Sequence, residues 1–276
     1  KKKKNAEIFD IENSDRAFEE EVMLSGFANA AVKAEGAAVT FDNANETFTS
    51  RYTHETVARP FAITEEAVED NLYDSIAKRY TKALARSMAN TKQIKAANVL
   101  NNGFNSSFPG GDGKELFATD HPTVSAGSLK NELSTSADLS ETSLEQAMID
   151  IAAFKDERGL KIAARGLKLI IPSELQFTAE RILKSPARVG TSDNDLNALS
   201  SKGMLPQGYV VNNFLTDTDA FFIKTDVPNG MKMFNRAAIK TAMEGDFDTG
   251  NMRYKARERY SFGFSDWRGM FGSPGA

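Results

Sequence analysis

The sequence predicts an α+β protein in which one unusually long helix lies against a sheet, and three observations support this prediction. The stretch from Thr64 to Asn101 contains neither proline nor glycine, and its apolar residues recur at helical spacing. The stretch Asn251–Phe264 alternates apolar and cationic residues with the period of two that is typical of a strand. Between them, Gly166–Ile171 reads GLKLII, a buried type of strand, and a helical pattern follows it.

The long helix is expected to have one apolar and one basic arc. At 1.5 Å per residue it would be roughly 55 Å long, several times the usual length of a globular helix. Thr64 is expected to cap its start, and Gly103 to follow its end in a left-handed conformation. The apolar arc comprises Leu72, Tyr73, Ile76, Tyr80, Ala83, Leu84, Met88 and Ile94. The basic arc comprises Lys78, Arg79, Lys82 and Arg86, and it is either a solvated face or a face turned to a polyanion or an acidic neighbour.

Composition restricts the possible chemistry. The chain has 276 residues, a net charge of −4 and 41% hydrophobic residues, which suits one large or two moderate domains. It contains no cysteine and only two histidines, His54 and His121, so disulfides and thiolate chemistry are excluded and a His-rich metal site is poorly supplied. No cofactor or metal is therefore expected. No stretch approaches the ~18 apolar residues of a membrane span, and no membrane partner is expected.

The N-terminal quarter carries little core of its own. Residues 5–33 contain isolated hydrophobics without an amphipathic block, which predicts an extended arm whose apolar partners lie elsewhere. Gly36–Phe41 and Thr47–Ile63, separated by turn residues, predict a long hairpin that leads directly into the helix. A two-stranded ribbon is marginal in water by itself, so a neighbouring subunit is the expected support.

The C-terminal strand has an apolar and a cationic face. Its cationic face consists of Arg253, Lys255, Arg257 and Arg259, and Glu258 interrupts the apolar face. This row of cations suits an anionic surface or acidic partners across a subunit contact, and a solvated face is the alternative.

The long irregular passage after the helix offers weak catalytic signals. Gly113-Lys114 is followed by Glu115, which does not fit a phosphate-binding loop. Asp120 and His121 could form half of a catalytic pair, but no serine lies in a nucleophile elbow. A soluble hydrolase that uses Asp120 and His121 remains the alternative of a different class.

The order of arm, hairpin, long helix, α/β insertion and basic-aromatic strand resembles the major capsid proteins of tailed bacteriophages with the HK97-type fold, in particular the Mu-like major head subunit group. The resemblance covers nearly the whole chain. It is carried by the stretches RYTHETVARPFAITEEAVEDNLYDSIAKRYTKALARSMANTKQIKAANVLNNGF, GLKLIIPSEL, NNFLTDTDAFFIKTDVPNG and GDFDTGNMRYKARERYSFGFSDWRG.

The resemblance implies a division of the chain into four parts. These are an N-terminal arm (1–33), an E-loop hairpin (34–63), a peripheral domain (64–158 and 235–276) with the spine helix 64–101, and an axial domain (159–234). The arm and the E-loop would reach over adjacent subunits.

The implied function is self-assembly into hexamers and pentamers of an icosahedral shell that encloses double-stranded DNA. The protein would be non-enzymatic, would reside in the virion head and would be assembled in the cytoplasm of the host bacterium. Portal, scaffold and decoration proteins are further expected partners. An encapsulin-like nanocompartment shell, which shares the fold, is the alternative.

Two groups of site residues follow from these expectations. Lys78, Arg79, Lys82 and Arg86 are the candidates for an interior, DNA-facing surface. Phe48, Arg51, Tyr52 and Arg59 are the candidates for inter-subunit contacts of the E-loop. Some family members crosslink subunits through a Lys–Asn isopeptide bond, but no motif assigns that bond here, so it is not predicted.

Overall fold

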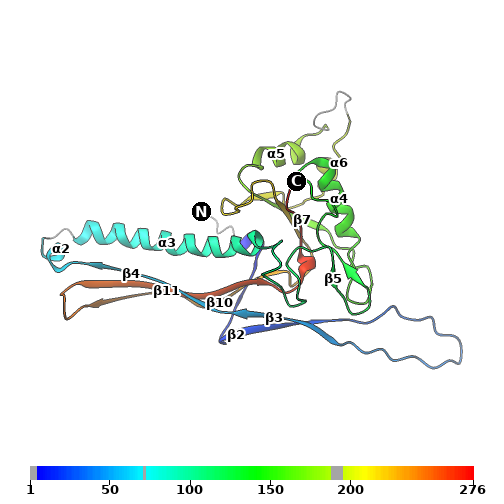
Figure 1. Cartoon of the computed structure of the whole chain (residues 1–276), viewed down its shortest axis with the longest axis horizontal. Coiled ribbons are helices and arrows are strands. Elements are labelled where there is room, and N and C mark those ends of the chain that lie inside the picture. Colours follow the sequence, from blue (N-terminus) through cyan, green and yellow to red (C-terminus); the bar gives the residue numbers. More distant parts are fainter. Residues whose placement is uncertain (1–4, 71–72, 188–194) are drawn as a thin grey trace.

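A computed structural model of the chain describes residues 5–70, 73–187 and 195–276. It confirms the α+β class and contains three parts (Figure 1). The part that we call the wing is a long helix lying along a four-stranded sheet. The body is an α/β unit at one end of the wing, and a long hairpin projects from this junction in the opposite direction (Figure 1).

The wing sheet has the strand order β1-β10-β11-β4 and is antiparallel except for the pairing of β1 with β10. Its strands are β1 (Asp10–Asn13), β4 (Glu55–Ile63), β10 (Met231–Gly245) and β11 (Met252–Phe264). The predicted strand Asn251–Phe264 is therefore confirmed as β11. It lies inside the sheet, between β10 and β4.

The predicted helix Thr64–Asn101 consists of two helices, α2 (Glu65–Glu69) and α3 (Tyr73–Asn101). The 29 residues of α3 span about 43 Å. Thr64 caps α2 as predicted, because its Oγ1 accepts a hydrogen bond from the Ala67 amide at 3.4 Å. The prediction for Gly103 is wrong, since its φ is not positive; a Cβ there would lie 2.6 Å from the Phe117 ring, so the glycine makes room for that ring.

The buried stripe of α3 follows a spacing of four residues. Leu84, Met88, Ala96 and Leu100 are buried, and the partly buried Lys92 lies in the same row. The predicted apolar arc is thus correct for Leu84 and Met88. It is wrong for Tyr80, Ala83 and Ile94, which are exposed, while Leu72 and the side chains of Tyr73 and Ile76 lie outside the described residues.

An ion pair explains why Glu258 interrupts the apolar face of β11. Lys92 Nζ of α3 lies 3.1 Å from Glu258 Oε2 and 4.5 Å from the centre of the Tyr260 ring. Both charged side chains are largely removed from water. Because each neutralises the other, a lysine and a glutamate occupy positions that the pattern otherwise reserves for apolar residues.

The body is built on a second four-stranded sheet with the order β12-β9-β7-β8. Its strands are β7 (Gly166–Ile171), β8 (Tyr209–Val211), β9 (Phe221–Thr225) and β12 (Met270–Ser273). Helices α4 (Glu141–Ala152), α5 (Gln176–Lys184) and α6 (Ala198–Lys202) pack with one face of it. The small strands β5 (His121–Pro122) and β6 (Ser128–Leu129) and the 3-10 helix η1 (Trp267–Gly269) complete the body.

The two faces of the body sheet belong to different cores. Leu169 and Phe221 face the core that includes α4, α5 and α6. Ile170 and Phe222 face the core that includes Leu100, near the end of α3. Helix α4 therefore shares a core with β7, although the predicted boundary at residue 159 places them in different domains.

The N-terminal region differs from the prediction. Ile8, at the end of α1 (Asn5–Ile8), and the adjacent Phe9 are buried within the same chain, so this part of the arm finds its apolar partners without a neighbour. The predicted hairpin of Gly36–Phe41 with Thr47–Ile63 is wrong. The hairpin instead pairs β2 (Phe18–Leu24) with β3 (Glu46–Thr53), and β4 pairs with β11.

The reason for this error lies in β2, whose alternation is inverted. Glu19 and Glu21 are half-buried, whereas Phe18, Val22 and Leu24 are exposed. Glu21 is bonded to Lys232 and to the Ser265 hydroxyl, so its carboxylate is satisfied inside the molecule. A strand whose acids point inward does not show the usual pattern of a half-buried strand.

We expect Lys92→Met to lower the free energy of unfolding by about 3 kcal/mol, because it leaves the Glu258 carboxylate buried and unpaired. The double variant Lys92→Met/Glu258→Met should recover most of that loss, since it removes both charges. Urea unfolding of the single and double variants measures both effects. Equal losses in the single and the double variant would contradict the pairing.

Candidate assembly surfaces

The accessible surface of the chain is larger than a compact monomer requires. It measures 16027 Å² for a mass of 30.2 kDa, whereas a compact monomer of this mass exposes about 11,700 Å². The wing and the hairpin account for this extended shape (Figure 1). The excess is comparable to the area that obligate subunits bury against each other.

The connection between β2 and β3, residues 25–45, carries apolar side chains that are exposed to solvent. Val32 and Phe41 are 100% and 99% exposed, and Phe27 and Val39 are also exposed. Arg158 anchors the end of this loop, because its Nη2 donates to the Asn43 carbonyl at 2.7 Å and lies 3.6 Å from Asp42. Exposed apolar side chains on an anchored loop are typical of a contact with another molecule.

The predicted inter-subunit residues fall into different environments. Tyr52 is only 3% exposed: its hydroxyl lies 2.5 Å from Ser265 Oγ and its ring packs edge-on against Phe234. Burial raises the pKa of Tyr52. The prediction for Tyr52 is therefore wrong, because the side chain is used within its own subunit.

The other three candidates reach the surface to different extents. Phe48 is half-buried, and Arg51 is exposed on β3, with its guanidinium 3.8 Å from the centre of the Phe18 ring. Arg59 is exposed on the edge strand β4. Phe48, Arg51 and Arg59 remain predictions.

His54, between β3 and β4, joins the arm to the wing. Its Nε2 lies 2.9 Å from Ser14 Oγ, and its Nδ1 lies 3.0 Å from Ser261 Oγ. Burial and the nearby Arg259 guanidinium lower the pKa of His54, which favours a neutral ring. A neutral imidazole suits these two hydroxyl partners, since each hydroxyl can donate or accept.

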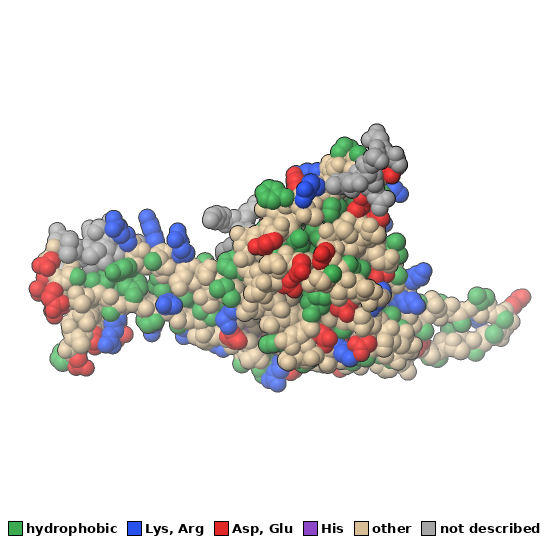
Figure 2. All heavy atoms as spheres, turned by 45° about the horizontal axis from the view of Figure 1, so that its top comes forward, with side chains coloured by type: hydrophobic (Ala, Val, Ile, Leu, Met, Phe, Trp, Pro, Cys, Tyr) green, Lys and Arg blue, Asp and Glu red, His purple; other side chains and the backbone are tan. Residues whose placement is uncertain are grey.

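The basic arc of α3 points away from the sheet. Arg79, Lys82 and Arg86 are exposed, and Figure 2 shows Lys and Arg side chains along the outer side of the wing. Within the described part of the chain no acidic side chain pairs with these three residues. The side chain of Lys78 lies outside the described residues.

The opposite side of the wing is also cationic. Ala256 and Glu258 of β11 face α3, so the alternating Lys255 and Arg257 point to the other face of the sheet and are exposed. Arg253, at the end of this row, is bonded to Asp246, and Arg259 is half-buried. The predicted division of β11 into an apolar and a cationic face is thus confirmed.

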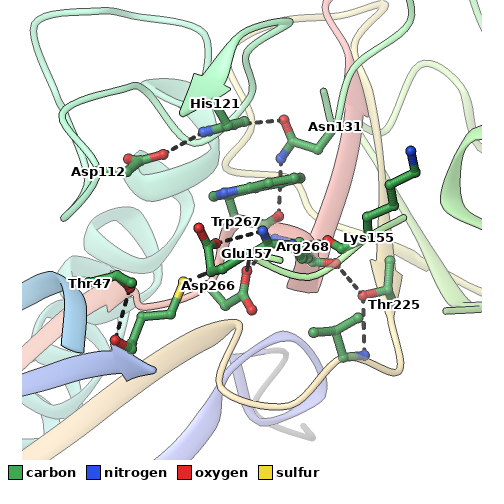
Figure 3. A network of polar contacts seen from close by, with 12 residues as sticks. Thr47, Asp112, His121, Asn131, Lys155, Glu157, Thr225, Asp266, Trp267 and Arg268 are labelled. Carbon is green, nitrogen blue, oxygen red and sulfur yellow. Dashed lines mark hydrogen bonds and ion pairs between the residues drawn. The ribbon is translucent and has the colours of Figure 1, made fainter. Parts of the chain in front are cut away.

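A buried polar network fixes the irregular passage against the C-terminal segment (Figure 3). His121 is fully buried: its Nδ1 lies 2.6 Å from Asp112 Oδ2, and its Nε2 lies 3.1 Å from Asn131 Oδ1. The amide nitrogen of Asn131 donates to three backbone carbonyls, which fixes its oxygen toward the histidine. Both ring nitrogens of His121 are thus occupied within the chain, and the ring stacks on Trp267 with the ring centres 4.3 Å apart.

Arg268 is the second centre of this network. It is 3% exposed and forms an ion pair with the equally buried Glu157 at 2.7 Å, and its Nε donates to the Lys155 carbonyl. Its Nη1 also lies 3.8 Å from Met23 Sδ of β2 (Figure 3). Arg268 thus connects the base of the hairpin with the body.

This geometry removes the support for a hydrolase. Asp120 is paired with Lys114 at 2.5 Å, whereas the carboxylate beside His121 is that of Asp112. The ring of His121 is inaccessible and both of its nitrogens are occupied, so it cannot serve a substrate as a general base. In the described part of the chain, no cluster of His, Asp and Glu could hold a metal ion, and no helix is long and apolar enough to cross a membrane.

Sequence reasoning missed the loop 25–45 and the network of Arg268. The apolar content of residues 25–45 signals a contact surface, but the inverted pattern of β2 conceals that they connect two strands. Arg268 and Glu157 are far apart in sequence, and no local pattern indicates that they meet.

Comparison with known proteins yields both a family and a fold. A family model described as phage capsid protein matches residues 45–272, whereas no curated protein sequence matches the chain. The capsid of an empty GTA particle superposes with a TM-score of 0.62 at 13% identity, covering 97% of this chain and 88% of that one. The capsid of Myoviridae phage XM1 gives 0.58 at 13% identity, covering 98% and 89%. A virus-like particle from Pyrococcus furiosus gives 0.53 at 10% identity, covering 97% and 91%. The predicted HK97-type fold is confirmed.

We expect His121→Ala to lower the free energy of unfolding by about 3 kcal/mol, because it leaves the Asp112 carboxylate buried without its partner. Asp120→Asn, at the exposed neighbouring position, should change it by less than about 1 kcal/mol. Chemical denaturation monitored by Trp267 fluorescence measures both. A stable His121→Ala protein would contradict a structural role for the network.

Proposed function

This chain belongs to the phage capsid protein family, and we propose on that premise that it forms hexamers and pentamers of an icosahedral shell around double-stranded DNA. It is a major capsid protein, a structural protein of the virion that assembles with copies of itself. The observation that carries the proposal is the accessible surface of 16027 Å², which a compact monomer of this mass does not need. The stretches quoted above favour the Mu-like major head subunit group.

The parts of the chain support a division of labour within such a shell. The hairpin β2–β3 with residues 25–45 is proposed to act as the E-loop in place of the expected range 34–63, and its exposed Val32, Val39 and Phe41 would be covered by an adjacent subunit. Phe48, Arg51 and Arg59 are proposed to contribute to that contact. Residues 64–158 and 235–276, with the spine helix, are proposed as the peripheral domain and residues 159–234 as the axial domain. The packing of α4 against β7 supports counting α4 with the axial domain.

The basic arc of α3 is proposed to face the packaged genome. Arg79, Lys82 and Arg86 are exposed and have no acidic partner among the described residues, and Lys78 precedes them at helical spacing. DNA would be held by non-specific attraction between these cations and its phosphates. Portal, scaffold and decoration proteins are proposed as further partners, with assembly in the cytoplasm of the host bacterium. An encapsulin-like shell, which would contain cargo protein in place of DNA, is the alternative.

The purified chain should form closed shells of uniform size that are visible by electron microscopy. The physical reason is that the hairpin and the wing expose surface that contacts with other copies would bury. Nuclease-resistant DNA inside shells recovered from infected cells would separate a phage head from a cargo compartment. A chain that remains a monomer at every salt concentration would contradict the proposal.

Reversal of the basic arc, Lys82→Glu/Arg86→Glu, should weaken the binding of double-stranded DNA to the chain. The slope of log K against log salt should decrease in magnitude by about 2, because two phosphate contacts are lost. The matched control is Lys161→Glu/Lys202→Glu, which makes the same charge change at two exposed positions of the body. Equal slopes for both variants would contradict a DNA-facing role for the arc.

A further inference from the structure

The face of the wing sheet that points away from α3 carries a cluster of positive charges at its centre, and we call it the cationic face. We define this face by Lys240 of β10 and by Lys255 and Arg257 of β11. Lys240 lies directly opposite Arg257 in the register of the two strands. Like charges directly opposite each other destabilise a sheet. All three side chains are exposed, and no acidic group of the described residues forms an ion pair with them.

The shape of this face allows a partner to approach closely. In the register of the sheet, Lys255 lies between Pro60 and Ala242, and Arg257 lies beside Ala58. These neighbours of the two cations are small and exposed. Helix α3 covers the other side of the sheet, whereas no helix or strand of residues 5–70, 73–187 and 195–276 covers this side (Figure 1). A flat cationic face bordered by small side chains suits an anionic protein surface.

The far end of the wing has the complementary character. We define the wing tip as residues 65–70 and 246–250, which meet where the Glu65 carboxylate lies against Gly250 in the turn between β10 and β11. Its exposed carboxylates are those of Glu65, Glu66, Glu69, Asp70 and Asp248. Phe247, which precedes Asp248 in the turn, is fully exposed. A tip that carries exposed carboxylates and an exposed aromatic ring is suited to contact a cationic surface, because the ring face also attracts cations.

We propose that the wing tip of one copy docks on the cationic face of a second copy, with Phe247 packed on the small side chains beside Lys255 and Arg257. This inference rests on the proposed shell function and assigns one of its contacts. DNA is the less favoured occupant, because the proposed DNA-facing arc lies on α3, on the opposite side of the sheet. Tip and face are different surfaces of the same chain, so the contact is heterologous and can close into a ring of copies.

The test is a charge exchange between the two surfaces in the full-length chain. Lys255→Glu/Arg257→Glu on the face and Glu66→Lys/Glu69→Lys at the tip should each raise the protein concentration needed for shell assembly about tenfold or more. The variant that carries all four substitutions should assemble nearly as well as the natural chain, because opposite charges meet again. Phe247→Ala should raise the required concentration without changing its dependence on salt.

The control is again Lys161→Glu/Lys202→Glu, which should assemble normally. Light scattering and electron microscopy across protein concentrations give the readout. Normal assembly of both reversed variants, or failure of the four-fold variant to recover, would overturn the inference while the shell function stands. Normal shells that lose DNA on Lys255→Glu/Arg257→Glu would assign the face to DNA and would also overturn it. Failure of the natural chain to assemble would overturn the proposed function and this inference together.

Discussion

The wing is fixed at only one end, and the rest of the structure depends on how that end is held. The last turns of α3 lie in a core shared with the body, where Ala96 and Leu100 pack with Ile170 and Phe222. Farther out, the helix is held on the sheet by a small cluster of Leu84, Met88 and Ala256. The Lys92–Glu258 pair lies between these two regions. A helix anchored in this way places its far end tens of ångströms from the main core, and buries little surface in doing so.

Charges inside the molecule and charges on its surface serve different purposes. Arg268–Glu157, His121–Asp112 and Lys92–Glu258 are paired within the chain and shielded from water, so each specifies one arrangement of distant segments. The surface charges of the wing are instead separated by sign, with acids at the tip and cations on both sides. Separation of this kind makes like charges repel one another within a single copy, and a second molecule that brings the opposite sign relieves this repulsion.

The elements that could be predicted from the sequence are those in which burial follows a regular pattern from residue to residue. β11 alternates because one face meets α3, and β7 is mostly apolar because it is buried on both faces. The hairpin could not be predicted, because the inward-facing Glu21 is satisfied by Lys232, which is remote in sequence. The predicted apolar arc of α3 was wrong at several positions, because the buried row of the helix passes through Lys92, whose charge is paired with the remote Glu258. Among the site residues, exposure of Arg79, Lys82 and Arg86 followed from the helical period, whereas burial of Tyr52 depends on Phe234 and Ser265.

The hairpin loop 25–45 and the wing are expected to respond differently to the salt concentration. The loop 25–45 exposes apolar side chains and carries few charges, so salt changes its contacts little and the excluded anions of kosmotropic salts strengthen them. The contact proposed between the wing tip and the cationic face depends on exposed charges, which are screened over about 8 Å at physiological ionic strength. A shell that uses both kinds of contact would therefore keep its hairpin contacts at high salt while its wing contacts weaken. The hairpin and the wing project in opposite directions from the body (Figure 1). The wing contacts could therefore reorganise while the hairpin contacts still hold the subunit to its neighbours.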